Sequence, residues 1–282
     1  MRKTAFFTMD VESFGDISCL REKNRAEYEN FRVENMMADY LDLLDKYGIK
    51  ATFFVVCSSL EYTGEYLARA VKGGHEIALH GLTHDIIAHT DREEIKRQLA
   101  EGKALLEREF NTKVCGYRAP CFAITNDVIE VVRELGFKYD SSRLDIKLSY
   151  VRSAAGFDGF ERVCEGILKS ENFYEISPCK VKTPFGTVNI SGGGYLRLAP
   201  YSMVKRGIKK FLKTSDYYAF YCHPFDIFTG KVPPLKGISP LNAHYVKAGR
   251  KNFLSRTENI IKMLVDEGYA FSTIGDFLNT EI

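Results

Sequence analysis

Two histidines four residues apart are the first side chains in this sequence whose spacing suggests chemistry. His80 and His84 follow the apolar run 77–79, which is bounded by glycines and is typical of a short buried strand. If the turn after His80 begins a helix, both imidazoles return to the same side and can bind one cation at ~2.0–2.1 Å. Neutral imidazole is the commonest protein ligand for zinc and related metals. Such pairs also occur in cores and on surfaces, so this interpretation depends on the residues that the fold places beside them.

Apolar runs and helical stripes alternate along most of the chain. We expect strands at 4–9, 51–57, 77–79, 114–117, 137–139, 217–222 and 269–273, and helices at 33–47, 65–72, 90–110, 126–135 and 252–267. This alternation predicts an α/β fold built from βα units around a parallel sheet or barrel. Residues 13–30 are expected to form a long polar loop. Residues 141–200 are rich in Gly and Ser, so we expect an irregular insertion with a small hairpin inside a single domain spanning 1–282.

Polar side chains follow the predicted strands at the points where the strands end. In chain order they are Asp10, Glu12, His80, His84, Arg118, Asp140 and His223. The active sites of α/β barrels and open parallel sheets gather at the carboxyl ends of the strands. These seven groups are therefore expected to converge on one face, which is a stronger indication of a site than the histidine pair alone.

Composition excludes several kinds of partner. The chain is 45% apolar and 27% charged, and one large domain is expected because α/β barrels commonly reach 282 residues without splitting. With a net charge of +2 and no dense Lys/Arg cluster, no nucleic-acid partner is expected. No stretch approaches the roughly 18–20 apolar residues of a transmembrane segment.

Cysteine usage and the start of the sequence both favour a cytoplasmic location. The seven cysteines form no CxxC pair, and their odd number favours reduced thiols. The apolar run after the basic residues 2–3 is too short for a signal peptide, and Asp10 follows it at once.

Five short motifs resemble those of the polysaccharide deacetylase family, the NodB-homology carbohydrate esterases of family 4. They read TMDVE at 8–12, HGLTH at 80–84, GYRAP at 116–120, YDSS at 139–142 and FYCHP at 220–224, in the order of the family. The first motif and the stretch GGYLRLAPY at 193–201 resemble the branch that carries Asp-Val-Glu in place of Asp-Asp. The resemblance covers residues 5 to about 226 and implies a distorted (β/α)7-type barrel with a mononuclear metal site.

The resemblance also implies a set of metal ligands and a general base. Glu12, His80 and His84 are expected to bind one divalent metal, most simply Zn, although Co, Fe or Ni also suits two imidazoles and a carboxylate. Asp10 is expected to take a proton from a bound water, and Arg118 to hold that carboxylate ionised and oriented. Since one residue separates the two acids, they face the same way only if the backbone stays extended. Which of the two acids binds the metal stays open.

The remaining implied roles concern the leaving group and the substrate. His223 is expected to protonate the departing amine, with Asp140 orienting its ring. A backbone N–H near Cys121 is expected to stabilise the oxyanion. The chain has no Trp, so sugar contacts are expected from the aromatic rings of Tyr117, Tyr195, Phe122 or Phe225, and from the glycine-rich stretch at Gly193. That stretch is equally compatible with a loop that only needs positive φ.

The implied activity is the hydrolytic removal of an N-acetyl group from an amino sugar in a glycan or glycan precursor. A cytoplasmic location favours a lipid-linked or nucleotide-linked carbohydrate as substrate. Two alternatives stay open: a deformylase or small-amide hydrolase that uses the same groups, and a catalytically inactive carbohydrate-binding homologue. The sequence fixes neither the sugar nor the oligomeric state.

Overall fold

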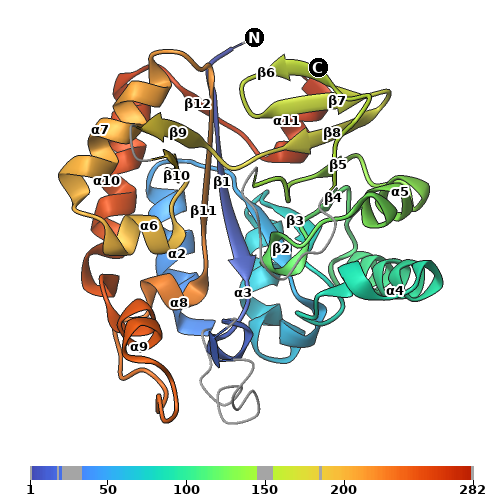
Figure 1. Ribbon diagram of the computed structural model, residues 1–282, viewed down its shortest axis with the longest axis horizontal. Coiled ribbons are helices and arrows are strands. Elements are labelled where there is room, and N and C mark those ends of the chain that lie inside the picture. Colours follow the sequence, from blue (N-terminus) through green and yellow to red (C-terminus); the bar gives the residue numbers. More distant parts are fainter. Residues whose placement is uncertain (1, 18, 21–33, 145–154, 184–185, 281–282) are drawn as a thin grey trace.

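The computed structural model of this chain describes residues 2–17, 19–20, 34–144, 155–183 and 186–280. Among these residues, seven neighbouring strands pair in parallel along the main path of one curled sheet (Figure 1). In spatial order they are β11 (Tyr217–Cys222), β1 (Thr4–Val11), β2 (Thr52–Val55), β3 (Glu76–Leu79), β4 (Gly116–Tyr117), β5 (Tyr139–Asp140) and β8 (Phe173–Ile176). The antiparallel strands β7 (Ile167–Ser170) and β6 (Glu161–Cys164) extend the sheet beyond β8, and β12 (Ala270–Phe271) pairs with the start of β1. The carboxyl ends of the parallel strands therefore meet at one end of the sheet.

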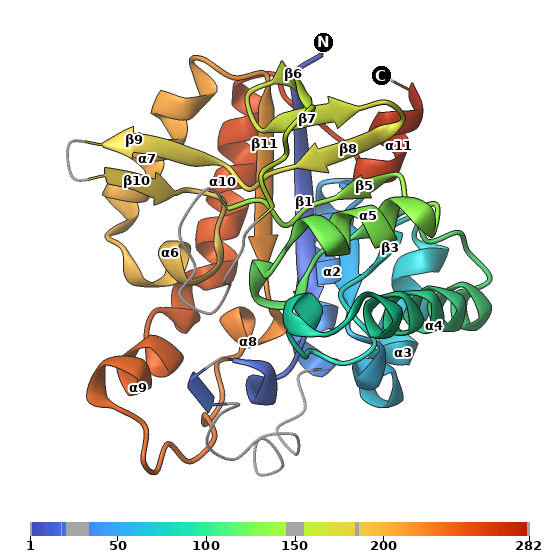
Figure 2. The same cartoon turned by 45° about the vertical axis from the view of Figure 1, so that its right-hand side comes forward.

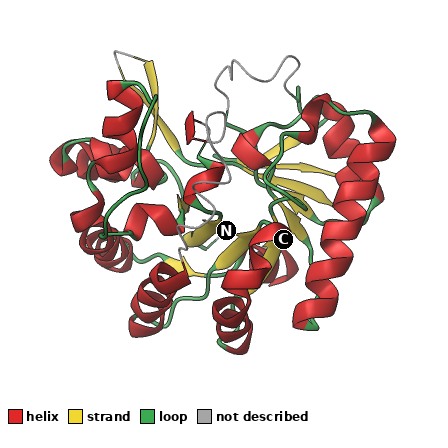
Figure 3. Ribbon diagram, turned by 90° about the horizontal axis from the view of Figure 1, so that it is seen from below, coloured by secondary structure: helices red, strands yellow, loops and turns green. Residues whose placement is uncertain are grey.

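Helices cover the outside of the sheet, as the view from below shows (Figure 3). The longer ones are α2 (Glu34–Lys46), α3 (Leu60–Lys72), α4 (Arg92–Phe110), α5 (Asn126–Glu134), α7 (Tyr201–Leu212) and α10 (Phe253–Asp266). The shorter ones are α6 (Gly193–Leu198), α8 (Pro224–Ile227), α9 (Pro240–Lys247) and α11 (Ile274–Thr280). All eight residues of β1 are buried, as expected for a parallel strand covered on both faces. None of the described helices is long and apolar enough to cross a membrane.

The α/β fold class is confirmed, with a strongly curled, open sheet in place of a closed barrel. The ends of the sheet path are β11 and β6, which do not pair in the described part of the chain. Extended segments next to β11 satisfy part of its free edge: the Tyr221 N–H donates to the Ser191 carbonyl at 2.8 Å, and the Ala219 N–H to the Cys179 sulfur at 3.0 Å. These contacts protect an edge that would otherwise expose unpaired backbone groups.

Residues 141–200 contain more regular structure than their composition predicts. The expected hairpin is present as β9 (Lys180–Thr183) and β10 (Gly186–Asn189), but β8 belongs to the main sheet and pairs with β5 (Figure 2). All four residues of β8 are buried, and so short an apolar run cannot be told from a loop by its periodicity. Part of this segment, and most of the polar loop expected at 13–30, lie outside the described residues.

Candidate active site

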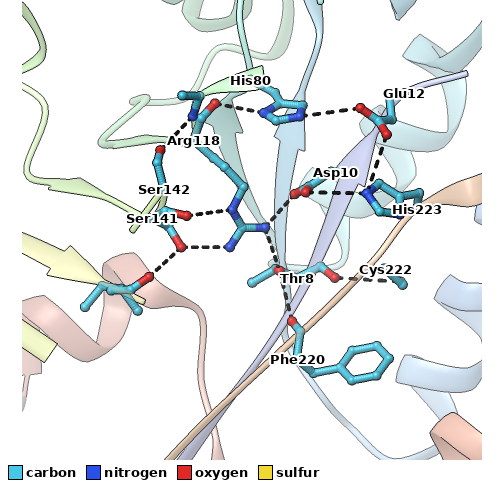
Figure 4. Close-up of polar contacts among 12 residues, drawn as sticks. Thr8, Asp10, Glu12, His80, Arg118, Ser141, Ser142, Phe220, Cys222 and His223 are labelled. Atoms are coloured by element: carbon cyan, nitrogen blue, oxygen red, sulfur yellow. Dashed lines mark hydrogen bonds and ion pairs between the residues drawn. The ribbon is translucent and has the colours of Figure 1, made fainter. Parts of the chain in front are cut away.

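Five of the seven predicted polar groups line one pocket at the carboxyl end of the sheet. Figure 4 shows four of them, Asp10, Glu12, His80 and His223. The pocket has a volume of about 380 Å³. Its lining residues are Asp10, Glu12, Asp16, Ile17, Cys19, His80, His84, Cys121, Phe122, Tyr221, His223, Phe225, Asn242 and Tyr245. Strands β1, β3 and β11 supply most of the polar groups, because each of these strands ends at this edge of the sheet.

Glu12, His80 and His84 form a buried cluster whose donor atoms all lie within 4.8 Å of one another. One Glu12 oxygen, Oε2, lies 2.5 Å from His84 Nε2 and 3.6 Å from His80 Nε2. Burial opposes the charge of the Glu12 carboxylate, but the neighbouring His84 and His223 outweigh it and hold the pKa of Glu12 well below its ordinary value. An ionised carboxylate facing two imidazoles is a donor set that fits a divalent cation.

A hydrogen bond to the backbone fixes the tautomer of His80. His80 Nδ1 lies 2.8 Å from the Arg118 carbonyl oxygen. Since a carbonyl only accepts, Nδ1 carries the proton and Nε2 presents its lone pair toward Glu12. Two acceptors 3.6 Å apart repel unless a cation or proton lies between them. This second contact of the ring is the usual way in which proteins orient a metal-binding histidine.

His84 returns to the cluster through a turn and not through the helix that its four-residue spacing would also allow. Gly81 has φ +112°, in the region that favours glycine, and a Cβ there would lie 2.5 Å from the Thr83 carbonyl oxygen. The turn is anchored by backbone bonds of 3.0 Å from Cys57 N–H to Gly81 O and from Ser58 N–H to Leu82 O. The short spacing of the two histidines therefore reflects a glycine turn.

Arg118 holds Asp10 in a fully buried ion pair. Arg118 Nη1 donates to Asp10 Oδ1 at 2.5 Å and to Thr8 Oγ1 at 3.0 Å. The rest of the guanidinium donates to the Ser141 carbonyl at 3.0 Å and to the Ser141 hydroxyl at 2.7 Å, and it lies 3.9 Å from the centroid of the Phe54 ring. One oxygen of Asp10 is thus fixed, and the other, Oδ2, faces His223 Nε2 at 3.8 Å (Figure 4).

Asp226, which the sequence interpretation overlooked, orients His223. His223 Nδ1 lies 2.8 Å from Asp226 Oδ2, and the His223 backbone N–H donates to the same oxygen at 3.0 Å. Arg197 Nε donates to the other Asp226 oxygen at 2.5 Å, with both side chains inaccessible to solvent. Burial opposes the imidazolium, but the carboxylates of Glu12 and Asp226 outweigh it and raise the pKa of His223 to about 9. His223 Nε2 is left facing the pocket, 3.5 Å from Glu12 Oε1.

Asp140 does not contact His223, so its predicted role there needs correction. Its carboxylate accepts from the Ser142 N–H at 2.9 Å and the Ser142 hydroxyl at 2.7 Å. Burial raises the pKa of Asp140, and burial beside Asp140 raises the pKa of Glu175 well above its ordinary value. The Ser142 oxygen also accepts from the Ala119 N–H at 2.8 Å. Asp140 therefore supports the loop that carries Arg118, on the side of Arg118 away from His223.

Local sequence carried a signal for Asp226. Pro224 stands at the first position of helix α8 and Asp226 at the third, and the Asp226 carboxylate folds back to the His223 N–H as half of a capping box. Proline at the first position and an acid at the third are the sequence signature of a helix start. A His-Pro-x-Asp segment thus predicts that the acid lies beside the histidine.

Two of the predicted substrate contacts are placed very differently. Tyr117 is fully buried, with its ring 6.1 Å from that of Phe137, so it cannot stack on a sugar. Successive strand residues point to opposite faces, which sends Tyr117 outward where Arg118 points inward. Cys121 does line the pocket, and both Cys121 and Phe122 have positive φ, +54° and +57°. Such backbone strain in non-glycine residues clusters at functional sites, and the oxyanion role near Cys121 stays a prediction.

Gly193 and Tyr195 do not line the pocket; the glycines of this stretch instead support two aromatic residues that do. A Cβ on Gly193 would lie 3.1 Å from the Tyr221 ring, and one on Gly194 would lie 2.9 Å from the Tyr245 ring. Tyr221 and Tyr245 both line the pocket. Of the four rings expected to face a sugar, Phe122 and Phe225 line the pocket, and Tyr221 and Tyr245 line it in addition.

We expect Asp226→Asn and Asp140→Asn to have different effects on His223. Asp226→Asn removes a carboxylate that raises the pKa of His223, so this pKa should fall from about 9 in chelator-treated protein. Asp140→Asn should leave it within a few tenths of the native value, because Asp140 contacts Ser142. NMR titration of the histidine ring protons measures both. Equal shifts in the two variants would contradict the assignment of Asp226.

The comparisons with known families agree with this geometry. A curled α/β half-barrel with a Glu–His–His cluster at its carboxyl end defines a class of fold with a candidate divalent-metal site. Residues 27–139 match the model of the family described as polysaccharide deacetylase, and residues 148–278 match a domain of unknown function, DUF3473. His80, His84 and Arg118 lie in the first match. Over residues 27–139 this chain is therefore similar to the polysaccharide deacetylase family.

Individual relatives show the same similarity. The chain is 33% identical over 122 residues to the peptidoglycan deacetylase-like protein FGM2 of Gibberella zeae, and 34% identical over 115 residues to the peptidoglycan deacetylase of Helicobacter pylori. These matches cover 42% and 40% of this chain but 36% and 39% of the relatives, so it spans less than half of their length. A crystal structure described as a polysaccharide deacetylase from Mycobacterium smegmatis has a TM-score of 0.63 at 16% identity, covering 99% of this chain and 90% of that one. That likeness supports the fold.

Proposed function

We propose that this protein is a metal-dependent hydrolase that removes the N-acetyl group of an amino sugar in a glycan or glycan precursor. The observation that carries the proposal is the arrangement of groups around one pocket. Glu12, His80 and His84 form one cluster. Beside it lie the carboxylate of Asp10, which Arg118 holds, and the imidazole of His223. Amide hydrolysis requires these three elements: an electrophilic catalyst, a base for water and an acid for the amine.

Glu12, His80 and His84 would hold the cation, since their donor atoms converge and the tautomer of His80 presents Nε2. When bound there, a divalent metal polarises the amide carbonyl and lowers the pKa of a water molecule. Two imidazoles and one carboxylate leave further positions open for water and substrate, as in catalytic zinc sites. We propose Zn as the resident metal, with Co, Fe or Ni compatible with the same ligands.

The residues around the cluster would move the two protons of the reaction. Asp10 Oδ2, which faces the pocket, accepts a proton as water adds to the acetyl carbon, while Arg118 keeps the carboxylate ionised and aimed. His223 donates the proton from Nε2 to the sugar nitrogen as the C–N bond breaks, releasing acetate and the free amine. Asp226 holds Nδ1 during this step, so the ring keeps the orientation that presents Nε2.

The proposed substrate is a lipid-linked or nucleotide-linked saccharide in the cytoplasm. The seven cysteines form no CxxC pair and are odd in number, which supports a reducing compartment. The pocket carries aromatic rings from Phe122, Tyr221 and Tyr245, which can stack on a sugar in the absence of Trp.

Product analysis tests the proposed reaction. Purified protein loaded with Zn or Co is incubated with N-acetylated and N-formylated amino sugars, presented as nucleotide diphosphates, lipid diphosphates and neutral oligosaccharides. We expect acetate in stoichiometric amounts with the new amine. Formate release alone would favour the small-amide hydrolase. Saturable sugar binding without either product, under every metal, would identify an inactive carbohydrate-binding homologue.

A further inference from the structure

A second hollow, lined by cations, lies beside the candidate active site. It has a volume of about 560 Å³, and the residues that line it are Phe228, Thr229, Gly230, Lys231, Val232, Lys247, Gly249, Arg250, Lys251 and Asn252. Four of these residues are basic and none is acidic. In the described part of the chain, none of the four forms an ion pair, whereas surface arginines elsewhere are paired, as Arg97 is with Glu94 at 2.7 Å. The hollow therefore concentrates positive charge that the described residues leave uncompensated.

Arg250 is the residue that distinguishes this hollow from an ordinary basic surface. Its side chain is only 5% exposed, and Nη2 donates to the Val246 carbonyl. The other two nitrogens, Nε and Nη1, are buried and have no hydrogen-bond partner among the described residues. Burial, together with the nearby Arg197, lowers the pKa of Arg250 to about 10. Burial outweighs the attraction of the nearby Asp226 carboxylate. A buried guanidinium with two nitrogens that lack a hydrogen-bond partner is costly to the fold, so an anion that bonded to these nitrogens would stabilise it.

The residues that pack around Arg250 belong to segments that also lie next to the catalytic pocket. The guanidinium lies 4.8 Å from the centroid of the Phe14 ring, and Phe14 packs against Phe228, whose ring centroid is 5.4 Å away. Helix α9 contributes Asn242 and Tyr245 to the catalytic pocket and its last residue, Lys247, to the hollow. Helices α8 and α9 both lie toward the end of the molecule where β1 terminates (Figures 1 and 2). The two hollows are therefore neighbours that share helix α9 as part of their walls.

We propose that this hollow is an anion subsite that binds the phosphate or diphosphate group of a saccharide whose N-acetyl group occupies the catalytic pocket. Phosphoryl groups fit it because they carry up to two charges and several acceptor oxygens each, which matches one guanidinium and three ammonium groups. The subsite rests on the proposed function for its substrate, but its affinity for diphosphate does not depend on turnover.

Direct binding tests the subsite without any catalysis. Inorganic pyrophosphate is titrated calorimetrically into the full chain at a fixed ionic strength of about 50 mM, where exposed charges are weakly screened. We expect saturable binding that weakens at least tenfold in a Lys231→Gln/Lys247→Gln variant. A Lys205→Gln/Lys209→Gln variant serves as a matched control, because these lysines line a hollow that also contains Asp266 and Glu267. No saturable binding to the native chain, or equal weakening in both variants, would overturn the subsite.

Arg250→Met separates a ligand-binding arginine from a structural one. Methionine replaces the unpaired guanidinium by an apolar side chain that fills much of the same space, so the melting temperature without ligand should stay equal or rise. The increase in melting temperature that pyrophosphate gives the native protein should be lost in this variant. A lower melting temperature combined with undiminished pyrophosphate binding would show that Arg250 is structural, and would overturn its place in the subsite.

Turnover then distinguishes the sources of the phosphate. Deacetylation is compared on a nucleotide-diphosphate sugar, a short-chain lipid-diphosphate sugar and a neutral N-acetylated oligosaccharide. In the Lys231→Gln/Lys247→Gln variant, KM for the diphosphate substrate that the subsite binds should rise about tenfold over that of the native chain. KM for the neutral oligosaccharide should rise less than twofold. An equal rise for charged and neutral substrates would overturn the proposal. Pyrophosphate binding without turnover of any substrate would instead sustain the subsite and overturn the deacetylase function.

Discussion

Replacing His80 and His84 together by alanine is expected to remove the bound divalent metal and to reduce acetate release to near background. The two imidazoles provide two of the three ligands that converge within 4.8 Å. Glu12 alone is left, and one carboxylate does not hold a dication against water. Because the metal contributes several kcal/mol of transition-state stabilisation, hydrolysis should fall by on the order of 10³-fold or more. Elemental analysis and acetate release measure the two losses.

A matched control removes two other imidazoles. His89 and His244 are exposed, so His89→Ala/His244→Ala deletes as many histidines without disturbing the cluster. This variant should keep about one equivalent of metal and native turnover, as a mononuclear site predicts. In the native chain and in the control, chelation should lower the melting temperature, because bound metal stabilises the folded state by mass action. Native-level metal in the His80→Ala/His84→Ala variant would contradict the assigned site.

The groups that sequence could locate are those whose position follows from the end of a strand. Asp10, His80 and His223 each follow an apolar run, and parallel strands bring their carboxyl ends to one edge. The sequence alone therefore predicts that these three side chains lie close together. Strand β8 could not be predicted in this way. Its four buried residues lie within a Gly- and Ser-rich segment, and so short a run has too little periodicity to be recognised as a strand.

The position of an acid at the end of a strand does not determine whether it contacts His223. Asp140 also follows a strand, but β5 is separated from β11 by β4, β3, β2 and β1, and its carboxylate turns to Ser142. Asp226 reaches the ring because it lies three residues farther along the same chain, within a capping box. The contact follows from local helix-start chemistry, whereas the family resemblance implied the acid that follows β5. An acid three residues after a histidine, at the start of a helix, is therefore a better candidate partner for its ring than an acid on a distant strand.

The cationic hollow could not be inferred from charge patterning. Lys231 and the basic residues at 247–251 are separated by a loop and helix α9, and neither group is dense enough to indicate an anion site by itself. The fold brings them together around Arg250, whose burial is a property of packing against Phe14. The sequence predicts no nucleic-acid partner, and a compact site for one or two phosphates is compatible with that prediction.

Asp10→Asn is expected to lower turnover by on the order of 10²- to 10⁴-fold while leaving the metal in place. Asparagine keeps an oxygen that can accept from Arg118 Nη1, where Asp10 Oδ1 now accepts at 2.5 Å, so the geometry should survive. It cannot take a proton from water at neutral pH, because its amide is not basic. The loss should appear in kcat more than in KM, since the base acts in the transition state and contributes little to substrate binding.

The matching change at Glu12 decides which acid binds the metal. Glu12 contacts both metal-binding histidines, whereas Asp10 is paired with Arg118. Glu12→Gln should therefore lose metal in elemental analysis and lose activity with it, while Asp10→Asn loses activity alone. Added Zn or Co should restore part of the turnover of Glu12→Gln by mass action but none of that of Asp10→Asn. The reverse pattern, with metal lost from Asp10→Asn and kept by Glu12→Gln, would exchange the roles of the two carboxylates.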